Sequence, residues 1–268
     1  MDEVTFNRFR QIIYKLSGIS LGTNKEALVS ARVAKRMRVL GIPNHREYLR
    51  YVIQDKSGEE IIHLLDVIST NVTDFFRESD HFAFLKKVVS DWLAAGQRRF
   101  RFWSAACSSG EEPYSIAMTL LEATNSTANT DIKILATDIS TSVLDNCRTG
   151  TYDKEKLKPV PSALRERYFD QYRDDHTTYY TAKARLKDLV VFSMINLSTP
   201  PFPMSGPFDA VFCRNVMIYF DNNVRKNLLD EIYRLLKPGG YLMVGHAESL
   251  SAIESDFKLV KSSIYIKE

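Results

Sequence analysis

The chain has 268 residues, and its 44% hydrophobic and 26% charged content is ordinary for a soluble globular protein. No apolar run approaches the roughly 18 residues that span a bilayer, and the acidic start Met1-Asp2-Glu3-Val4 lacks the basic flank of a secretory signal, so we expect a cytoplasmic protein. The net charge of +3 is too small to indicate nucleic-acid binding, and cysteines without C-x-x-C spacing speak against a zinc cluster or a disulfide framework.

Residues 1 to about 95 are predicted to be helical. A stripe at spacings of three and four residues indicates a first helix that ends at Gly18, and it consists of Phe6, Phe9, Ile12, Ile13 and Leu16. Similar stripes predict helices at about 25–40, 48–53, 61–68 and 79–95. We therefore predict a helical domain over residues 1–75 and a connecting helix over residues 76–95.

The second of these helices is basic. Against the single acid Glu26 it carries the basic residues Lys25, Arg32, Lys35, Arg36 and Arg38. Two interpretations are open. The charges form either a solvated helix face, which is common, or a docking surface for an acidic partner that comprises Arg32, Lys35, Arg36 and Arg38.

From residue 96 to residue 268 strands alternate with helices. Strands are expected at about 100–103, 132–138, 190–195, 208–213 and 241–245, and helices at about 113–123, 140–147 and 223–236. This alternation predicts an α/β fold with a mostly parallel sheet that is covered on both faces. Between about 150 and 190 the alternation breaks down, which indicates an excursion from the sheet.

The first strand runs into a loop of small residues, Ser104 to Gly110, and then into a helix that begins with Glu111 and Glu112. In open parallel sheets, ligands bind beyond the carboxyl ends of the strands. A phosphate-binding loop would carry more glycines and a lysine, so the two glutamates favour a positively charged ligand such as S-adenosylmethionine. Alternatively, an acid at this place only stabilises the helix N-terminus, by about 0.3–1 kcal/mol.

Polar residues follow the later strands at the same edge of the sheet. Asp138 ends the second strand, where a carboxylate accepts hydrogen bonds from ribose hydroxyls or, alternatively, caps the next helix. Asn196 and Leu197 follow the third strand, where an amide and an apolar side chain suit an adenine. Arg214 and Asn215 follow the fourth. Taken together, these strand ends predict a cofactor crevice.

At this point the chain resembles the CheR family of chemotaxis receptor methyltransferases, over nearly its whole length. The matching blocks are TNVTDFFR at 70–77, WSAACSSGEEPY at 103–114, ATDI at 136–139, PFDAVFCRNVMIYFD at 207–221 and LKPGG at 236–240. The resemblance implies a Rossmann-like class I methyltransferase domain with a small β-subdomain inserted at about 150–190. A small all-α domain that docks the substrate precedes it.

The resemblance also implies a function: S-adenosylmethionine-dependent methylation of glutamate side chains on chemoreceptors, which gives glutamyl methyl esters and serves chemotactic adaptation. S-adenosylhomocysteine is the product. The implied cofactor contacts are Asn71, Thr73, Arg77, Glu112, Asp138, Asn196, Leu197, Arg214 and Asn215, with Glu111 as the substitute for Glu112. The basic helix would face the receptor's cytoplasmic helical bundle. In some members the β-subdomain binds a peptide at the receptor's C-terminus and carries a glycine-rich turn, where this chain has Arg173-Asp174-Asp175-His176-Thr177-Thr178.

The predicted chemistry needs no general base, because a glutamate with a pKa of about 4.3 is already an anion at neutral pH. Alignment and exclusion of water are the main tasks in an in-line displacement between a carboxylate and a sulfonium. Arg77 is a candidate catalytic residue that orients either the substrate's carboxylate or, in our preferred reading, the cofactor's own. Tyr219 is the second, through its hydroxyl, unless it only packs. We expect no metal, and we expect His246 to be structural or peripheral.

Two alternatives belong to other classes of function. A methyltransferase acting on RNA would use the basic helix for phosphate contacts, but the fourth strand is followed by Arg214-Asn215-Val216-Met217 and not by an N-P-P-Y/F-type sequence that grips a flipped base. A receptor-binding module without turnover would be free to lose the series Glu112, Asp138, Asn196 and Arg214.

Overall fold

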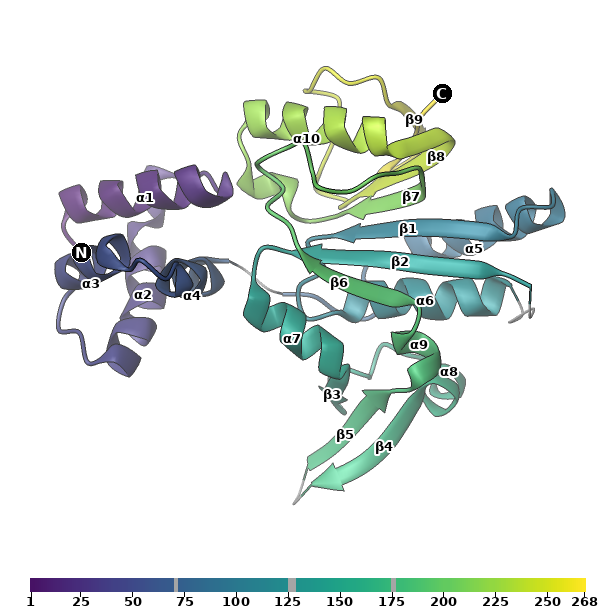
Figure 1. Ribbon diagram of the computed structural model, residues 1–268, viewed down its shortest axis with the longest axis horizontal. Coiled ribbons are helices and arrows are strands. Elements are labelled where there is room, and N and C mark those ends of the chain that lie inside the picture. The colour runs from purple at the N-terminus through teal and green to yellow at the C-terminus, as the bar shows by residue number, and fades with distance from the viewer. Residues whose placement is uncertain (70–71, 125–128, 175–176) are drawn as a thin grey trace.

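The computed structural model of the chain describes residues 1–69, 72–124, 129–174 and 177–268. Figure 1 shows the helices α1 to α4 at one end of the molecule and, beside them, a twisted sheet flanked by helices. Among the described residues, the strands form a seven-stranded sheet and a separate three-stranded sheet. The predicted fold class, an all-α part followed by a Rossmann-like part with a small β insertion, is confirmed.

The helical part begins and ends its first helix with well-formed caps. The side chain of Asp2 accepts a hydrogen bond from the Thr5 backbone N–H, and the helix ends, as predicted, at Gly18, whose φ is 70°. Phe9 and Ile13 of the predicted stripe are fully buried against the neighbouring helices. The bounds are α1 Glu3–Ser17, α2 Glu26–Leu40, α3 His45–Gln54 and α4 Glu59–Ile68, with a short 3-10 helix η1 at Thr23–Lys25.

The larger sheet has the order β6-β2-β1-β7-β8-β10-β9, and β6, β2, β1, β7 and β8 run parallel. The strands β10 and β9 close one edge in antiparallel pairing. Their bounds are β1 Arg99–Ala105, β2 Asp131–Asp138, β6 Val190–Met194, β7 Phe208–Cys213, β8 Leu236–Val244, β9 Lys258–Lys261 and β10 Ile264–Ile266. The helices of this part are α5 Asp80–Ala94, α6 Glu111–Ala123, α7 Thr141–Thr149 and α10 Asn222–Leu235, with a 3-10 helix η2 at Met217–Tyr219.

Helices cover both faces of this sheet. Successive side chains of a strand point to opposite faces, so strands that are apolar throughout need a cover on each face. On one face, Phe100 and Phe102 of β1 belong to the same core as buried residues of α5, α6 and α7. On the other face, Trp103 and Ala105 pack in a core with α10. Because these strands run parallel, their carboxyl ends lie along one side of the sheet. The predicted polar residues follow the strands on that side.

The turn before β8 differs from the prediction. The sequence predicts that Pro238-Gly239-Gly240 is a turn ahead of a strand from Tyr241, whereas the structure places these residues within β8. The pairing of β8 with β7 jumps from Phe208 opposite Leu236 to Ala210 opposite Tyr241. The glycines therefore form an irregularity inside the strand, and Gly239, with a φ of 73°, supplies its left-handed residue.

The excursion is a small antiparallel sheet, as the family resemblance implied. Its strand order is β3-β5-β4, so β4 lies at an edge. The bounds are β3 Thr151–Asp153, α8 Ser162–Tyr168, β4 Phe169–Asp174, β5 Thr177–Ala182 and α9 Ala184–Lys187. The domain boundaries at residues 75 and 95 stay a prediction, although α5 packs against α6 in the core of the sheet.

The helical part is attached to the sheet at the carboxyl ends of its strands. An isolated bridge pairs Ile19 with Phe220, and the Ser20 backbone N–H donates to the Tyr219 carbonyl across 2.8 Å. At the end of α1, the Tyr14 hydroxyl donates to Asp221 across 2.6 Å. These contacts place the segment after α1 over the strand ends that were predicted to bind a ligand.

Candidate functional site

A cavity of about 460 Å³ lies between the helical part and the carboxyl ends of the parallel strands. Its floor is formed by residues that follow β1, β2, β6 and β7, and its roof by the segment after α1 and by α2. Such a crevice at the switch in strand order is where open α/β sheets bind ligands. The volume suits a ligand of nucleoside size.

Most of the predicted site residues meet in the wall of this cavity. Those that line it are Arg32, Thr73, Arg77, Glu112, Asp138, Asn196, Leu197, Arg214, Asn215 and Tyr219. Those that do not are Glu111, Lys35, Arg36 and Arg38. Asn71 lies outside the described residues.

A guanidinium lies between two carboxylates at the cavity wall, where Arg214 and Glu112 line the cavity and Glu78 does not. Arg214 is 5% exposed, and its Nη1 and Nη2 atoms lie 3.0 Å from Glu112 and 3.0 Å from Glu78. Burial raises the pKa of Glu112 and outweighs the opposing effect of Arg214. At Glu78, burial is opposed by Arg214 together with hydrogen bonds from the His246 backbone N–H and the Asn215 side chain, and the net effect lowers the pKa. Two acids against one base leave negative charge beside the cavity, which suits a cationic ligand.

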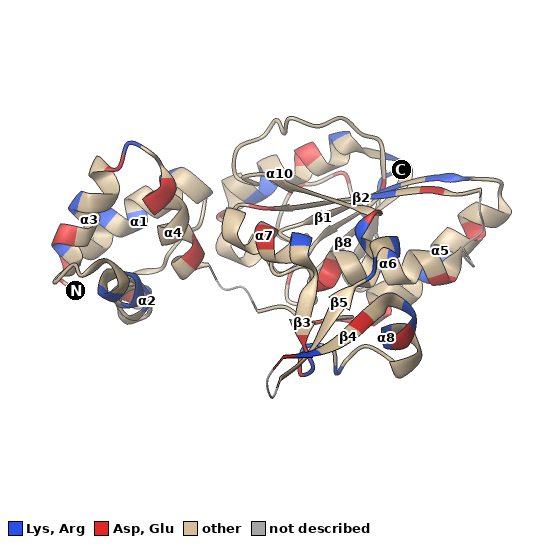
Figure 2. Ribbon diagram, turned by 60° about the horizontal axis from the view of Figure 1, so that its bottom comes forward, with Lys and Arg blue, Asp and Glu red and all other residues tan. Residues whose placement is uncertain are grey.

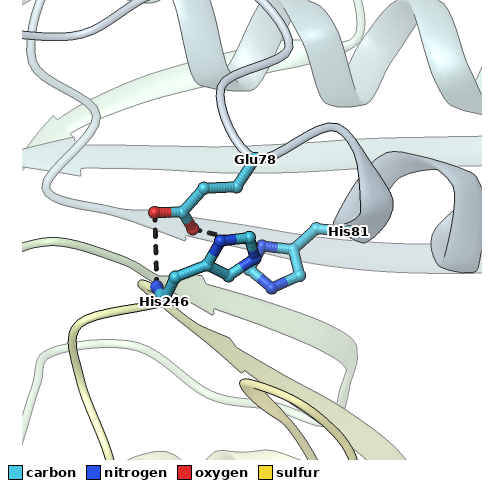
Figure 3. A group of neighbouring side chains, drawn as sticks. All are labelled: Glu78, His81 and His246. Carbon is cyan, nitrogen blue, oxygen red and sulfur yellow. Dashed lines mark hydrogen bonds and ion pairs between the residues drawn. The ribbon is translucent and has the colours of Figure 1, made fainter.

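Figure 3 shows that Glu78 also contacts two histidines, His81 and His246. Ligand-type atoms of these three residues lie within 4.8 Å of one another. Glu78, however, already accepts hydrogen bonds from Arg214 and from the His246 backbone N–H. We assign no ion to this cluster, because the Arg214 guanidinium holds the Glu78 carboxylate and repels a second cation. Glu78 thus supports Arg214.

Asp138 anchors the loop that follows β1. Its carboxylate accepts from the Ser108 backbone N–H across 2.9 Å and from the Ser140 backbone N–H across 3.1 Å. Ser140, and not Asp138, is the N-cap of α7. Burial raises the pKa of Asp138. With the capping role taken by Ser140, the lone pairs of Asp138 that remain can accept hydrogen bonds from a ligand.

The two adjacent glutamates of α6 point to different places. Glu112 lines the cavity, where its Oε1 accepts from the Ser104 hydroxyl across 2.6 Å. Glu111 is fully buried on another side, 3.1 Å from the Nζ atom of Lys156. Lys156 in turn donates to the Thr73 carbonyl across 2.8 Å. Glu111 therefore anchors the cavity wall from behind and does not face the cavity.

Asn196 and Leu197 reach the cavity from the end of β6. The Asn196 amide nitrogen donates to the Leu16 carbonyl across 2.7 Å, and its oxygen accepts from the backbone and hydroxyl of Ser198. Leu197 is 6% exposed. The amide of Asn196 is thus largely engaged in holding the end of α1, and Leu197 offers the apolar surface.

Arg77 and Tyr219 carry polar atoms that stay available. Arg77 is half-buried, donates to the Val72 carbonyl across 2.9 Å, and forms no ion pair with any acid in the described ranges. The half-buried Tyr219 contributes its backbone carbonyl to the contact with Ser20, and within the described residues its hydroxyl has no hydrogen-bond partner. Both side chains can therefore meet a bound carboxylate.

The four basic residues that were predicted to dock a partner divide into two pairs. Figure 2 shows the basic residues along α2. Arg32 donates to the Ile68 carbonyl, and Arg36 forms two hydrogen bonds of 2.9 and 2.6 Å with Glu60. Lys35 and Arg38 are exposed. The docking role of this helix face stays a prediction.

Sequence reasoning missed several residues that hold the cavity wall. Glu78 and Lys156 are among them, and so is Glu248, whose carboxylate accepts from backbone N–H groups of the loop after β7. Glu78 stands next to a recognised block at 70–77, which is a weak signal. The other two lie in stretches without any motif.

The sequence matches known families over both parts. Residues 5–69 match the all-alpha domain of CheR methyltransferases, and residues 71–266 match the SAM binding domain of CheR methyltransferases. The chain is 41% identical over 250 residues to the chemotaxis protein methyltransferase of Borreliella burgdorferi, covering 91% of this chain and 87% of that protein. It is 38% identical over 265 residues to the chemotaxis protein methyltransferase of Escherichia coli, covering 99% and 91%.

Among solved structures, the chain is similar to the glycopeptide N-methyltransferase MtfA complexed with sinefungin, at 17% identity and a TM-score of 0.38 over 65% of this chain and 50% of that chain. Neither the TM-score nor the identity is high enough to support a functional argument. No helix in the described part of the chain is both long and apolar enough to cross a membrane.

Proposed function

The chain belongs to the CheR family of chemotaxis protein methyltransferases, and from this we propose that it methylates glutamate side chains of chemoreceptors. It is an S-adenosylmethionine-dependent enzyme with the family's SAM-binding domain. The products of the proposed reaction are glutamyl methyl esters and S-adenosylhomocysteine. Such esters change the charge of the receptor and so serve chemotactic adaptation.

One observation carries the proposal: the carboxylates of Glu112 and Asp138 line the cavity at the carboxyl ends of the parallel strands, where open α/β sheets bind ligands. When bound, S-adenosylmethionine supplies an electrophilic methyl group on a cationic sulfonium. Glu112 would hold its amino group and Asp138 its ribose hydroxyls, and Arg77 would pair with its carboxylate. Leu197 would cover the adenine, with Thr73, Asn196 and Asn215 completing the wall. Glu111 is left out of this set, because it faces Lys156.

The substrate carboxylate needs no general base, since it is ionised at neutral pH with a pKa of about 4.3. The chain's task is to strip water from that carboxylate and to align it. Tyr219 would donate its hydroxyl to the incoming oxygen, and Arg77 would add positive charge to the cavity wall. The segment after α1 covers part of the cavity and would help to keep bulk water out.

The proposed partner is the cytoplasmic helical domain of a chemoreceptor, and we expect the enzyme to act in the cytoplasm. Lys35 and Arg38 on α2 would face the acidic surface of that domain. The small sheet offers a second contact. Its edge strand β4 is almost entirely exposed, and an extended peptide from the receptor's C-terminus could pair with such an edge.

The proposal is tested by incubating the protein with methyl-labelled S-adenosylmethionine and receptor-rich membranes. We expect label in the receptor that alkali releases as methanol, because carboxyl methyl esters are alkali-labile. Arg98→Ala is a suitable control beside Arg77→Ala, since Arg98 also donates to a backbone carbonyl but lies outside the cavity. Alkali-stable label, or label in added RNA, would contradict the proposal.

A further inference from the structure

A buried carboxylate lies directly behind the cavity wall and is held by backbone groups. Glu248 follows β8 and is 7% exposed. It does not itself line the cavity. Burial raises its pKa, and the groups that oppose this effect are backbone N–H groups of Gly245, Asn215, Ile218 and Met217. The hydrogen bonds from these N–H groups offset the cost of burying the carboxylate, and they form only when the surrounding backbone is correctly placed.

Three of these donors show what the carboxylate connects. The Asn215 and Gly245 N–H groups donate to Oε2 across 2.7 and 2.8 Å, and the Ile218 N–H donates to Oε1 across 3.2 Å. Gly245 stands at the end of β8, whereas Asn215 and Ile218 belong to the loop that follows β7. One side chain therefore joins the loop after β7 to the end of the neighbouring strand.

The loop that Glu248 holds contains a non-glycine residue in a left-handed conformation. The φ of Asn215 is 58°, in the left-handed region that asparagine adopts more readily than other non-glycine residues. Such a conformation persists where the surroundings impose it. Arg214, Asn215, Ile218 and Tyr219 of this loop all line the cavity. Glu248 therefore holds a loop that forms part of the cavity wall.

We propose that Glu248 is a positioning residue for methyl transfer. Its carboxylate holds the loop 214–219 in the conformation that presents Asn215 to the cofactor and Tyr219 to the substrate. It touches neither ligand and acts through the loop. This inference rests on the proposed function and, in particular, on the roles proposed for Asn215 and Tyr219.

The chain offers a matched control for this idea. Glu231 on α10 is 6% exposed and likewise accepts from a backbone N–H, that of Phe202, across 2.8 Å. It is paired with Arg234 and does not line the cavity. Replacing Glu231 by glutamine perturbs a buried acid and a backbone contact at a distance from the site.

The experiment compares Glu248→Gln with Glu231→Gln. Calorimetric titration gives the dissociation constant of S-adenosylhomocysteine without receptor, steady-state assays with receptor membranes give KM and kcat, and thermal unfolding gives Tm. We expect Glu248→Gln to weaken cofactor binding and to lower kcat by about tenfold or more each, since misplacement of reacting groups by about 1 Å has effects of this size. Glu231→Gln should keep both constants, even where its Tm falls.

A second variant covers the case in which Glu248→Gln does not fold. A Cβ at Gly245 would lie 2.3 Å from Asn215 Nδ2 and 2.9 Å from Glu248 Oε2, so Gly245→Ala displaces the same groups without removing a charge. We expect it to show the same loss of cofactor affinity and kcat.

Wild-type constants in folded Glu248→Gln, or in Gly245→Ala if the former does not fold, would overturn the inference. Cofactor affinity is measured without receptor. A failure of the wild type to methylate receptors would therefore contradict the proposed function and leave the affinity test of Glu248 in force.

Discussion

The Nη1 atom of Arg214 lies 3.0 Å from Oε2 of Glu112, so the carboxyl end of β7 is tied to the first turn of α6. Arg214 and Glu112 both line the cavity. Glu78 binds the other end of the same guanidinium at 3.0 Å. When all three groups are ionised, they leave one negative charge together, which suits the cationic sulfonium of the methyl donor.

Glu112 and Glu111 should respond differently to the loss of their charge. Glu112→Gln is expected to weaken binding of S-adenosylhomocysteine by about tenfold or more, because a charged hydrogen bond to a ligand contributes roughly 1.5–3 kcal/mol. Glu111→Gln should leave the affinity nearly unchanged and lower Tm, since Glu111 is buried against Lys156. Calorimetry and thermal unfolding of both variants check this. An equal loss of affinity in both would contradict the assignment.

Arg77→Ala is expected to abolish methyl transfer and to leave the fold intact. Arg77 lines the cavity and forms no ion pair with a described acid, so its removal leaves no buried charge unpaired. Receptor methylation and circular dichroism provide the two readouts, with Arg98→Ala as the control. Full activity in Arg77→Ala would remove Arg77 from both proposed roles.

The fully buried His81 should make the protein less stable in acid. Burial is the main cause that lowers the pKa of His81 from 6.5 to about 4. The unfolded chain then binds a proton that the folded chain does not, so stability falls as the pH drops from 6.5 toward about 4. A shift of this size corresponds to at most about 3 kcal/mol of unfolding free energy.

His81→Leu removes this contribution and leaves Glu78, Asp80, Arg214 and His246, which face the ring, in place. Urea unfolding of both proteins at neutral and acid pH isolates the effect of His81 as a difference. We expect the variant to gain on the wild type as the pH falls. A difference between the two that does not change with pH would show that His81 is not held neutral.

Mutations of the basic residues of α2 should affect either receptor methylation or protein stability. Lys35→Glu combined with Arg38→Glu should lower receptor methylation several-fold, more at low salt, and leave cofactor affinity and Tm unchanged. Arg36→Ala leaves Glu60, 4% exposed, without its guanidinium, and should cost up to about 3–5 kcal/mol of stability. If the double variant methylates receptors like the wild type, α2 is not the docking surface.

The amino-acid sequence predicts those parts of the fold and of the site whose signal is local or periodic. The stripe around Phe9 and Ile13 and the stop at Gly18 predict α1 with its true end, because helix burial and capping depend on near neighbours. The positions of Asp138 and Arg214 after buried strands predict a common edge, since the ends of parallel strands meet there.

Partners that are distant in the chain could not be predicted in this way. Consecutive residues on a helix point in directions about 100° apart, so the choice between Glu111 and Glu112 depends on how α6 is rotated against the sheet. Arg36 looks like its exposed neighbours until α4 brings Glu60 beside it. Glu248 carries no motif, because its partners are backbone N–H groups that only the fold assembles.

The most direct test of the central claim is mass spectrometry of a chemoreceptor cytoplasmic fragment after incubation with the wild-type protein and S-adenosylmethionine. The account predicts the added mass of one methylene on a glutamate side chain, lost again on treatment with alkali and missing after incubation with Arg77→Ala. Methylation of any other residue type, or of glutamate to the same extent by Arg77→Ala, would contradict it.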